Sequence, residues 1–308
     1  MNGLLRLLAL WFACTGLAAA ATPTIQSVFS DTDPDLNTDS SSGFWRGAMS
    51  VRIERDRYGR RVPRYRTEVR TRWTRKNLYF LFICPYEELN LKPNPQTSTE
   101  TNQLWNWDVA EVFAGADFKD IKRYREFEIS PQGEWIDLDV NLHNPHHEEG
   151  WTWNSGFEVS ARIDRAAHIW YGAMRIPYSA IDSRPPAAGN ILRVNLFRSQ
   201  GPPSTRQDLA WQAPRSETFH VPERFGLLKL VKNEKKNEKI EPSRHHSRRM
   251  QSARISRSHA GRRGFLGCGR SVGMRPLRCK NTAAECLYAG SGSRKATFPR
   301  NCSASESS

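Results

Sequence analysis

Two tryptophans and two carboxylates are gathered within ten residues, LWNWDVAEVF, at positions 104–113. The apolar residues from Val109 to Phe113 predict a strand that is buried on both faces. Trp105, Trp107 and Asp108 come just before this strand, so we expect them at its mouth. Aromatic and acidic groups in such a place suit a sugar-stacking platform, a haem or metal pocket or a pair of catalytic carboxylates, or they form the rim of a core.

Catalysis of glycoside hydrolysis would need two carboxylates that act on one bond. Asp108 and Glu111 are three residues apart, so a regular strand points them to opposite faces. Asp137 and Asp139 share a face, with Cα atoms about 6.5 to 7 Å apart by strand rise, which is within the range of carboxylate separations in glycosidases. Their simpler interpretation is two solvated carboxylates beside a sheet. We therefore expect no catalysis.

Two further segments carry residues that could bind a metal. DTDPDLNTD, residues 31–39, has carboxylates at alternate positions but lacks the glycine and the glutamate of an EF-hand, and Asp31, Asp33 and Asp35 are its candidate ligands for a structural calcium. NLHNPHHEEGW, residues 141–151, could hold zinc or copper, although a solvated loop is the simpler interpretation. Its candidate ligands are His143, His146, His147, Glu148 and Glu149.

Short strand signals that must position these groups follow one another between Thr22 and Val231. In REFEIS, residues 125–130, Phe127 and Ile129 face one way and the two glutamates the other, as expected for a strand half covered by a core. SPQGEW predicts a hairpin turn, and PYSAID, residues 177–182, a helical turn. The fold class is all-β, a single β-sandwich of immunoglobulin-like or jelly-roll type. The clearest strand signals lie at 67–73, 77–86, 109–115, 124–130, 134–140, 157–163, 168–177, 191–199 and 225–231.

The two ends of the chain differ in composition from its middle. Residues 1–21 combine Arg6, an apolar run and four alanines, which predicts a cleaved signal peptide and a secreted or periplasmic protein. Residues 232–308 hold 18 basic and 5 acidic residues, whereas the rest holds 28 and 27. This predicts a disordered basic tail after a nearly neutral domain at 22–231, and it argues against a nucleic-acid partner. We also expect no membrane span, because no later segment approaches about 18 apolar residues.

Six motifs, in order, resemble carbohydrate-binding module family 9, and more closely the exported bacterial proteins called family 9-like. Together they cover nearly all of residues 45–231. The motifs are WNWDVAEVF (105–113), REFEISPQGEWID (125–137), RIPYSAI (175–181), ILRVNLFR (191–198), AWQAP (210–214) and FHVPERFGLLKL (219–230).

The resemblance implies a β-sandwich that binds sugar without catalysis, sometimes with structural calcium. Such proteins are concerned with xylan or cellulose breakdown, so an oligosaccharide or polysaccharide is the implied ligand and glycoside hydrolases are the implied partners. In the best-known members two tryptophans clamp the terminal sugar ring. Trp105 matches the first, and Phe219 stands where the second is expected. The candidate sugar-binding residues are Trp105, Trp107, Asp108, Glu111, Trp211 and Phe219.

Haem binding is the competing function from another class. The same sandwich resembles the DOMON-type haem and redox domains. Met174, His168 and His143 of this chain could supply the axial ligands of such a haem. The sequence contains no Cys-x-x-Cys-His attachment motif, and Met174 alternates with its neighbours as an ordinary strand residue does. Sugar binding is therefore favoured, with a haem domain or a glycoside hydrolase accessory subunit as the alternatives.

Overall fold

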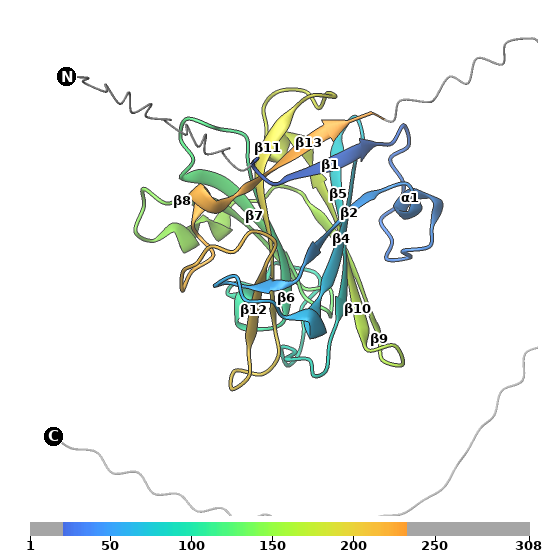
Figure 1. Ribbon diagram of the computed structural model, residues 1–308, viewed down its shortest axis with the longest axis vertical. Coiled ribbons are helices and arrows are strands. Elements are labelled where there is room, and N and C mark those ends of the chain that lie inside the picture. Colours follow the sequence, from blue (N-terminus) through green and yellow to red (C-terminus); the bar gives the residue numbers. More distant parts are fainter. Residues whose placement is uncertain (1–20, 233–308) are drawn as a thin grey trace, which may run out of the picture. The chain divides into compact units, whose positions relative to one another are not determined.

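The computed structural model describes residues 21–232, so the predicted signal peptide and basic tail lie outside the described residues apart from Ala21 and Lys232. Strands dominate this part of the chain (Figure 1). They are β1 (Thr24–Phe29), β2 (Met49–Ile53), β3 (Arg55–Asp56), β4 (Thr67–Trp73), β5 (Asn77–Pro85), β6 (Val109–Gly115), β7 (Arg123–Ile129), β8 (Trp135–Asn141), β9 (Glu158–Asp164), β10 (Ile169–Pro177), β11 (Ile191–Gln200), β12 (Gln207–Ala210) and β13 (Gly226–Val231). The helical segments are α1 (Gly43–Arg46) and the 3-10 turns η1 (Pro63–Tyr65), η2 (Leu104–Asn106), η3 (His147–Thr152), η4 (Tyr178–Ala180) and η5 (Pro222–Arg224).

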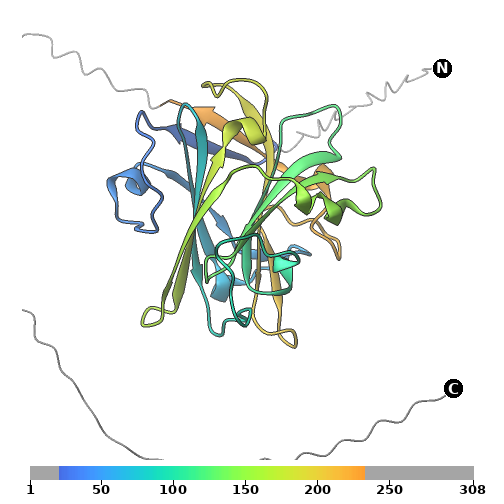
Figure 2. The same cartoon turned by 180° about the vertical axis from the view of Figure 1, so that it is seen from behind.

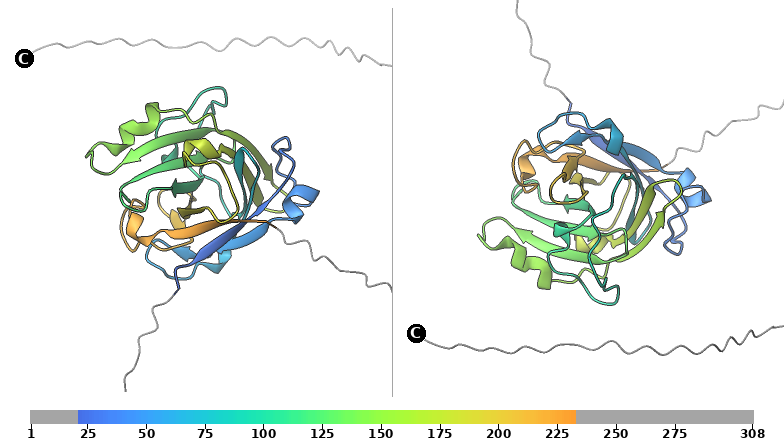
Figure 3. Two further views of the ribbon diagram at one scale, coloured as in Figure 1. Left: turned by 90° about the horizontal axis from the view of Figure 1, so that it is seen from above. Right: turned by 90° about the horizontal axis from the view of Figure 1, so that it is seen from below.

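The strands form one continuous sheet that folds back on itself into two layers (Figures 1 and 2). One layer has the order β8-β7-β6-β11-β13, and the other has the order β4-β5-β10-β9. β1 joins them, because it pairs in parallel with β13 along Thr24–Val28 and with β4 only at Val28 and Phe29. The layers curve around a shared interior, as the views from above and below show (Figure 3).

The main core lies between the two layers. Phe80 and Phe82 of β5 meet Val112 of β6, Phe127 of β7 and Met174 of β10, all of them fully buried. Because successive side chains of a strand point to opposite faces, the residues between these positions on β6 and β7 point out of the other side of their layer. That second face is also covered, and a smaller apolar cluster around Phe113, Tyr124 and Phe197 packs against it.

The nine strand segments expected from the sequence are confirmed, with ends that shift by at most about a residue or two. The hairpin between β7 and β8 is confirmed as well: Gly133 has φ +86°, and the amide of Ser130 donates to the carbonyl of Glu134. The helical turn is η4. No pattern in the sequence had indicated β1, β2, β3, β12 or α1.

The interpretation of REFEIS was right about alternation and wrong about exposure. Phe127 and Ile129 enter the core as expected, but Glu126 and Glu128 on the other face are 3% and 0% exposed. Loops that follow β8, β11 and β12 cover this face, and sequence patterning within one strand does not reveal such a cover. None of the helices within residues 21–232 is both long and apolar enough to cross a membrane.

Candidate functional site

A cavity of about 680 Å³ opens on the outer face of the layer that contains β6, β7 and β11. Its floor consists of outward-pointing strand residues, including Glu111 and Phe113 of β6, Glu126 of β7 and Ser199 of β11. Loop residues form its walls and rim. They are Arg57, Trp105, Asn106, His147, Glu148, Pro203, Arg206, Glu217, Thr218, Phe219 and His220.

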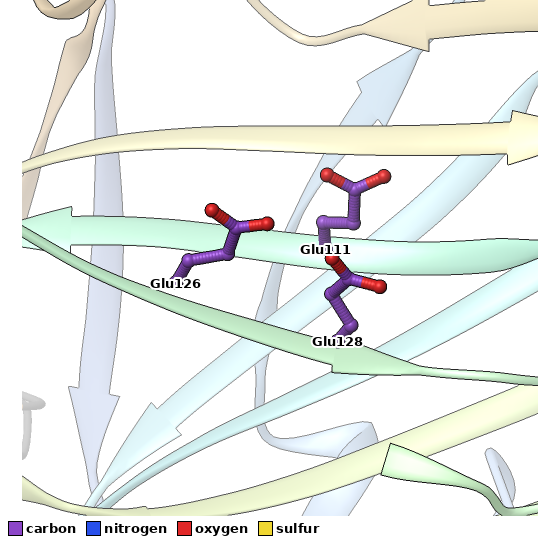
Figure 4. A group of neighbouring side chains, drawn as sticks. All are labelled: Glu111, Glu126 and Glu128. Atoms are coloured by element: carbon purple, nitrogen blue, oxygen red, sulfur yellow. The ribbon is translucent and has the colours of Figure 1, made fainter. Parts of the chain in front are cut away.

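Three glutamates converge at the floor (Figure 4). Glu111 and Glu128 are a direct cross-strand pair on β6 and β7, and Glu126 lies two residues before Glu128 on the same face. One carboxylate oxygen from each lies within 4.8 Å of the others. Like charges directly opposite each other destabilise a sheet, so this glutamate pair lowers the stability of the fold when both members are charged. We call these residues the glutamate triad.

Burial is the main cause of the raised pKa values of the glutamate triad. It raises the pKa of Glu126 to about 7, and burial together with the neighbouring carboxylates raises the pKa of Glu111 and of Glu128 well above the ordinary value. Oε1 of Glu111, Oε2 of Glu126 and both carboxylate oxygens of Glu128 have no hydrogen-bond partner among residues 21–232. These are four buried acceptor atoms at one point.

Two arginines hold the wall of the cavity. The Arg206 guanidinium donates to the backbone carbonyls of Trp105, Asn106 and Trp107 and lies 3.4 Å from Oδ1 of Asp208. Arg57 pairs with the same aspartate. The arginines therefore fix the 3-10 turn η2, which carries Trp105, against β12.

Trp105 offers an aromatic face to the cavity. Its neighbour Leu104 is fully buried and anchors the turn, whereas Trp105 itself is half-buried and lines the cavity. Within residues 21–232, no other aromatic ring pairs with Trp105. The side chain packs partly against the apolar cluster around Phe113 and also lines the cavity, where a ligand can contact it.

Phe219 also lines the cavity, but its ring is already sandwiched. One face stacks on Phe197 at a centroid distance of 4.2 Å and an angle of 10°, and the Arg57 guanidinium lies over the ring at 5.6 Å. Because Phe197 occupies one face, the arginine covers the other. Phe219 therefore has a ring and a guanidinium over its own ring, whereas Trp105 has neither among residues 21–232.

A histidine that sequence analysis did not single out completes the floor. His220 stacks on Phe113 at 5.2 Å, and its Nδ1 lies 2.6 Å from the Tyr124 hydroxyl. Burial lowers the pKa of His220 to about 3, so the ring is neutral. Burial also raises the pKa of Tyr124, so its hydroxyl stays protonated. Nε2 of His220 lies 3.9 Å from Oε2 of Glu126.

The histidine-rich segment is largely exposed, as expected for a solvated loop, and part of it also forms a wall of the cavity. Its 3-10 turn η3 places His147 against His220, with ring centroids 4.5 Å apart, and brings Glu148 to the rim. Gly150 makes this placement possible, because a Cβ there would collide with the backbone carbonyl of Asp139 on β8. The other candidates of this segment do not line the cavity: they are His143, His146 and Glu149.

The remaining candidate sugar-binding residues lie elsewhere. Trp107 does not line the cavity. Asp108 is fully buried and accepts a 2.7 Å hydrogen bond from the amide of Gly201, while burial raises its pKa to about 6. Trp211 packs against Gly226 of β13 and lines a separate cavity of about 630 Å³. Of the six candidates, Trp105, Glu111 and Phe219 are brought together.

Asp137 and Asp139 share a face of β8 as expected, but it is the face opposite to Leu138, which lines the cavity. Asp137 is fully buried, so it is not solvated as the simpler interpretation held, and it accepts a hydrogen bond from the Ser155 amide. Asp139 pairs with Arg125. Neither carboxylate reaches the cavity.

The structure does not gather the metal and haem ligand sets expected from the sequence. Asp33 accepts hydrogen bonds from Thr74, Asn77 and Tyr79, which tie its segment to β5. Within residues 21–232, the glutamate triad is the one group of three acidic, His or Cys ligands with mutual distances within 4.8 Å, so Asp31 and Asp35 join Asp33 in no such group. The haem candidates are dispersed: Met174 lies in the core, His168 beside Tyr86 and His143 beside Asp120.

Sequence reasoning missed Glu126, Glu128, Arg57, Arg206 and His220. One usable signal existed, because the two glutamates alternate with core residues on a predicted strand. The loop residues carried no such signal, since their approach depends on tertiary packing.

Comparisons with known proteins agree with this fold. No protein-family model matches the chain. A curated "Extracellular protein" of Arthroderma benhamiae is 24% identical over 144 residues, which is 42% of this chain and 64% of that relative, so the chain spans less than two thirds of its length.

A solved protein of Bacteroides uniformis, named as a provisional carbohydrate-binding protein, superposes with a TM-score of 0.52 at 14% identity over 68% of this chain and 100% of its own. A family 9 carbohydrate-binding module of Caldicellulosiruptor kristjanssonii, solved with cellotriose, has a TM-score of 0.49 at 13% identity over 69% and 96%. The likeness to the Bacteroides uniformis protein confirms the expected fold.

Proposed function

We propose that the chain binds a saccharide in the cavity beside Trp105. The observation that carries this proposal is the position of Trp105 in the lining of a cavity whose other walls are rich in charged and amide groups. A pyranose ring has a flat patch of C–H groups and a rim of hydroxyls, so it needs an aromatic face and polar partners together. The carbohydrate-binding name of the Bacteroides uniformis protein, which shares the fold, supports the proposal.

Stacking on Trp105 supplies the main attraction. Burial of an aromatic side chain removes about 150 to 250 Å² from water, which at about 25 cal/mol/Å² contributes several kcal/mol before costs. The rim groups Asn106 and Glu148 can then exchange hydrogen bonds with sugar hydroxyls. Because desolvation of those hydroxyls offsets much of the gain, we expect dissociation constants in the micromolar to millimolar range, roughly −8 to −4 kcal/mol.

The ligand class follows from the motifs rather than from the cavity. We expect a xylan- or cellulose-type oligosaccharide or chain end, bound by a secreted or periplasmic protein that assists glycoside hydrolases. The predicted signal peptide supports export, as does the name of the extracellular relative.

Hydrolysis by the protein itself is a weaker proposal. A retaining glycosidase holds its two carboxyl groups about 5 to 5.5 Å apart on either side of the bond. The glutamate triad has a comparable spacing, but its members project from one face of two adjacent strands. They lie on the same side of any bound sugar, so we propose binding without catalysis.

The test is a glycan-array screen of the purified full-length chain, followed by calorimetric titration with the best ligand. We expect saturable binding of a β-linked glucose or xylose oligosaccharide, and no new reducing ends after prolonged incubation. An array without any ligand would contradict saccharide binding. Turnover that disappears in a Glu111→Gln variant would instead show a hydrolase.

A substitution at Gly150, which does not line the cavity itself, should weaken saccharide binding by displacing the wall formed by η3. In Gly150→Ala the new methyl group collides with the Asp139 carbonyl, so η3 must move away from β8 and carry His147 and Glu148 with it. We expect saccharide affinity to fall by about 5- to 10-fold, roughly 1 to 1.4 kcal/mol.

Gly43→Ala is the matched control, since a Cβ at Gly43 meets no atom within 4 Å. Both variants are titrated calorimetrically with the same oligosaccharide. Unchanged affinity in Gly150→Ala would mean that η3 takes no part in the site.

A further inference from the structure

The glutamate triad has no role in sugar stacking that would explain three buried acids at one point. We infer that Glu111, Glu126 and Glu128 form a binding site for one hard divalent cation at the floor of the cavity. This site lies at the floor of the cavity in which we propose that the saccharide binds, and Glu111 is common to both, but cation binding can be tested without any sugar.

The spacing of the oxygens fits a single ion. Calcium binds carboxylate oxygens at about 2.3 to 2.6 Å, so two of its ligands can be at most about 5 Å apart. One oxygen from each glutamate lies within 4.8 Å of the other two, which allows all three to contact the same ion. The second oxygens of the carboxylates can add bidentate contacts, and the cavity leaves room for water molecules on the open side.

The orphaned oxygens are an independent reason to expect an occupant. Both oxygens of Glu128 are buried and have no hydrogen-bond partner among residues 21–232, and Glu111 and Glu126 each leave one further oxygen without a partner. Buried polar atoms in native proteins are almost always paired. Figure 4 shows the three side chains beside one another on the same side of the sheet.

The acidic side chains around the glutamate triad outnumber the basic ones by two. Four acidic side chains, the glutamate triad and Asp208, are accompanied by Arg57 and Arg206, and His220 is neutral. Full ionisation therefore leaves two negative charges at the base of the cavity. Neither arginine donates a hydrogen bond to the triad, because each is engaged by Asp208 and by backbone carbonyls. The rim acids Glu148 and Glu217 are exposed, with 52% and 88% of their side chains accessible, so solvent screens them.

The oxygen ligands select the kind of ion. Carboxylates suit Ca²⁺, Mg²⁺ and Mn²⁺, whereas softer metals prefer His and Cys. Glu111 and Glu126 line the cavity, so an ion can reach the triad from solvent. The competing occupant is the proton, since Glu126 and Glu128 are close enough to share one.

The experiment is a calcium titration of the purified, chelator-treated full-length chain. Calcium is the appropriate probe because the chain contains 8 His and 6 Cys, to which softer metals would bind elsewhere. We expect one ion per chain with a dissociation constant below about 1 mM, as in extracellular calcium modules. The melting temperature should rise by about 3 to 6 °C at ten times the dissociation constant. Terbium luminescence excited through tryptophan should appear on loading and decline when calcium displaces the terbium.

Glu128→Gln keeps the shape of the side chain but removes its charge, and we expect it to weaken calcium binding at least tenfold and to abolish the thermal shift. Glu111→Gln, at the cavity end of the triad, should do the same and serves if the first variant does not fold. Glu149→Gln, at an exposed carboxylate that does not line the cavity, is the control and should bind as the parent does. No saturable binding to the parent up to 10 mM calcium, or parental affinity in both triad variants, would overturn the cation site in favour of shared protons.

Discussion

Replacement of Trp105 by alanine is expected to weaken saccharide binding by at least about 30-fold, roughly 2 kcal/mol, in a protein that remains folded. Trp105 lines the cavity and has no aromatic ring or guanidinium over its own ring among residues 21–232, whereas Phe219 is held between Phe197 and Arg57. The loss should therefore resemble that of a central aromatic anchor.

Trp107 is the matched control for this change. It has the same chemistry two residues away and is also half-buried, but it does not line the cavity. Trp107→Ala should leave saccharide affinity within about twofold. Calorimetric titration of the parent and both variants with the best array ligand makes the comparison, and thermal melts verify folding. Equal losses in the two variants, or no loss in Trp105→Ala, would show that these residues only pack.

The largest expected effect on stability is that of Arg198→Ala, about 3 to 5 kcal/mol. Arg198 is fully buried on β11, with its side chain on the core face of its layer. Its guanidinium donates to the hydroxyl of Thr67 on β4 at 2.9 Å and to the carbonyl of Pro85 on β5 at 2.8 Å. These bonds join the two layers of the sandwich.

Removal of Arg198 leaves several groups uncompensated at once. The acceptors on β4 and β5 lose their donor, a cavity opens beside Trp170, and the buried carboxylate of Asp108 loses the favourable influence of the guanidinium. For a domain of this size we expect the melting temperature to fall by about 6 °C or more. Arg198→Lys, which keeps the charge but not the planar group of donors, should recover only part of the loss.

Arg66→Ala is the control for Arg198→Ala, because it also removes one arginine charge but no buried contact. Arg66 is exposed, and surface changes of this kind usually alter stability by no more than about 0.5 kcal/mol. Thermal and denaturant unfolding of the four proteins gives the values. A cost for Arg198→Ala below about 1 kcal/mol would show that the joined layers do not depend on this side chain.

The sequence alone determined the fold class and most of the sheet. Strands such as β4 and β6 have a local signature, because period-2 burial and β-branched or aromatic residues are properties of the segment itself. Trp105, Glu111 and Phe219 could also be chosen as candidate site residues, since they lie in motifs that carry the resemblance, and the structure brings these three to one cavity. Short or weakly patterned elements such as β3 and α1 offered too few residues for a period to show.

Tertiary structure alone decided what the second face of β6 and β7 does. Alternation placed Glu126 and Glu128 opposite the core, yet only the loops after β8, β11 and β12 bury that face and turn it into a cavity. The same packing covers both faces of Phe219, leaves Trp107 outside the cavity and brings His147 against His220. A strand's period tells which side chains share a face. It cannot tell what covers that face, because the cover comes from segments distant in the chain whose approach depends on packing across the whole domain.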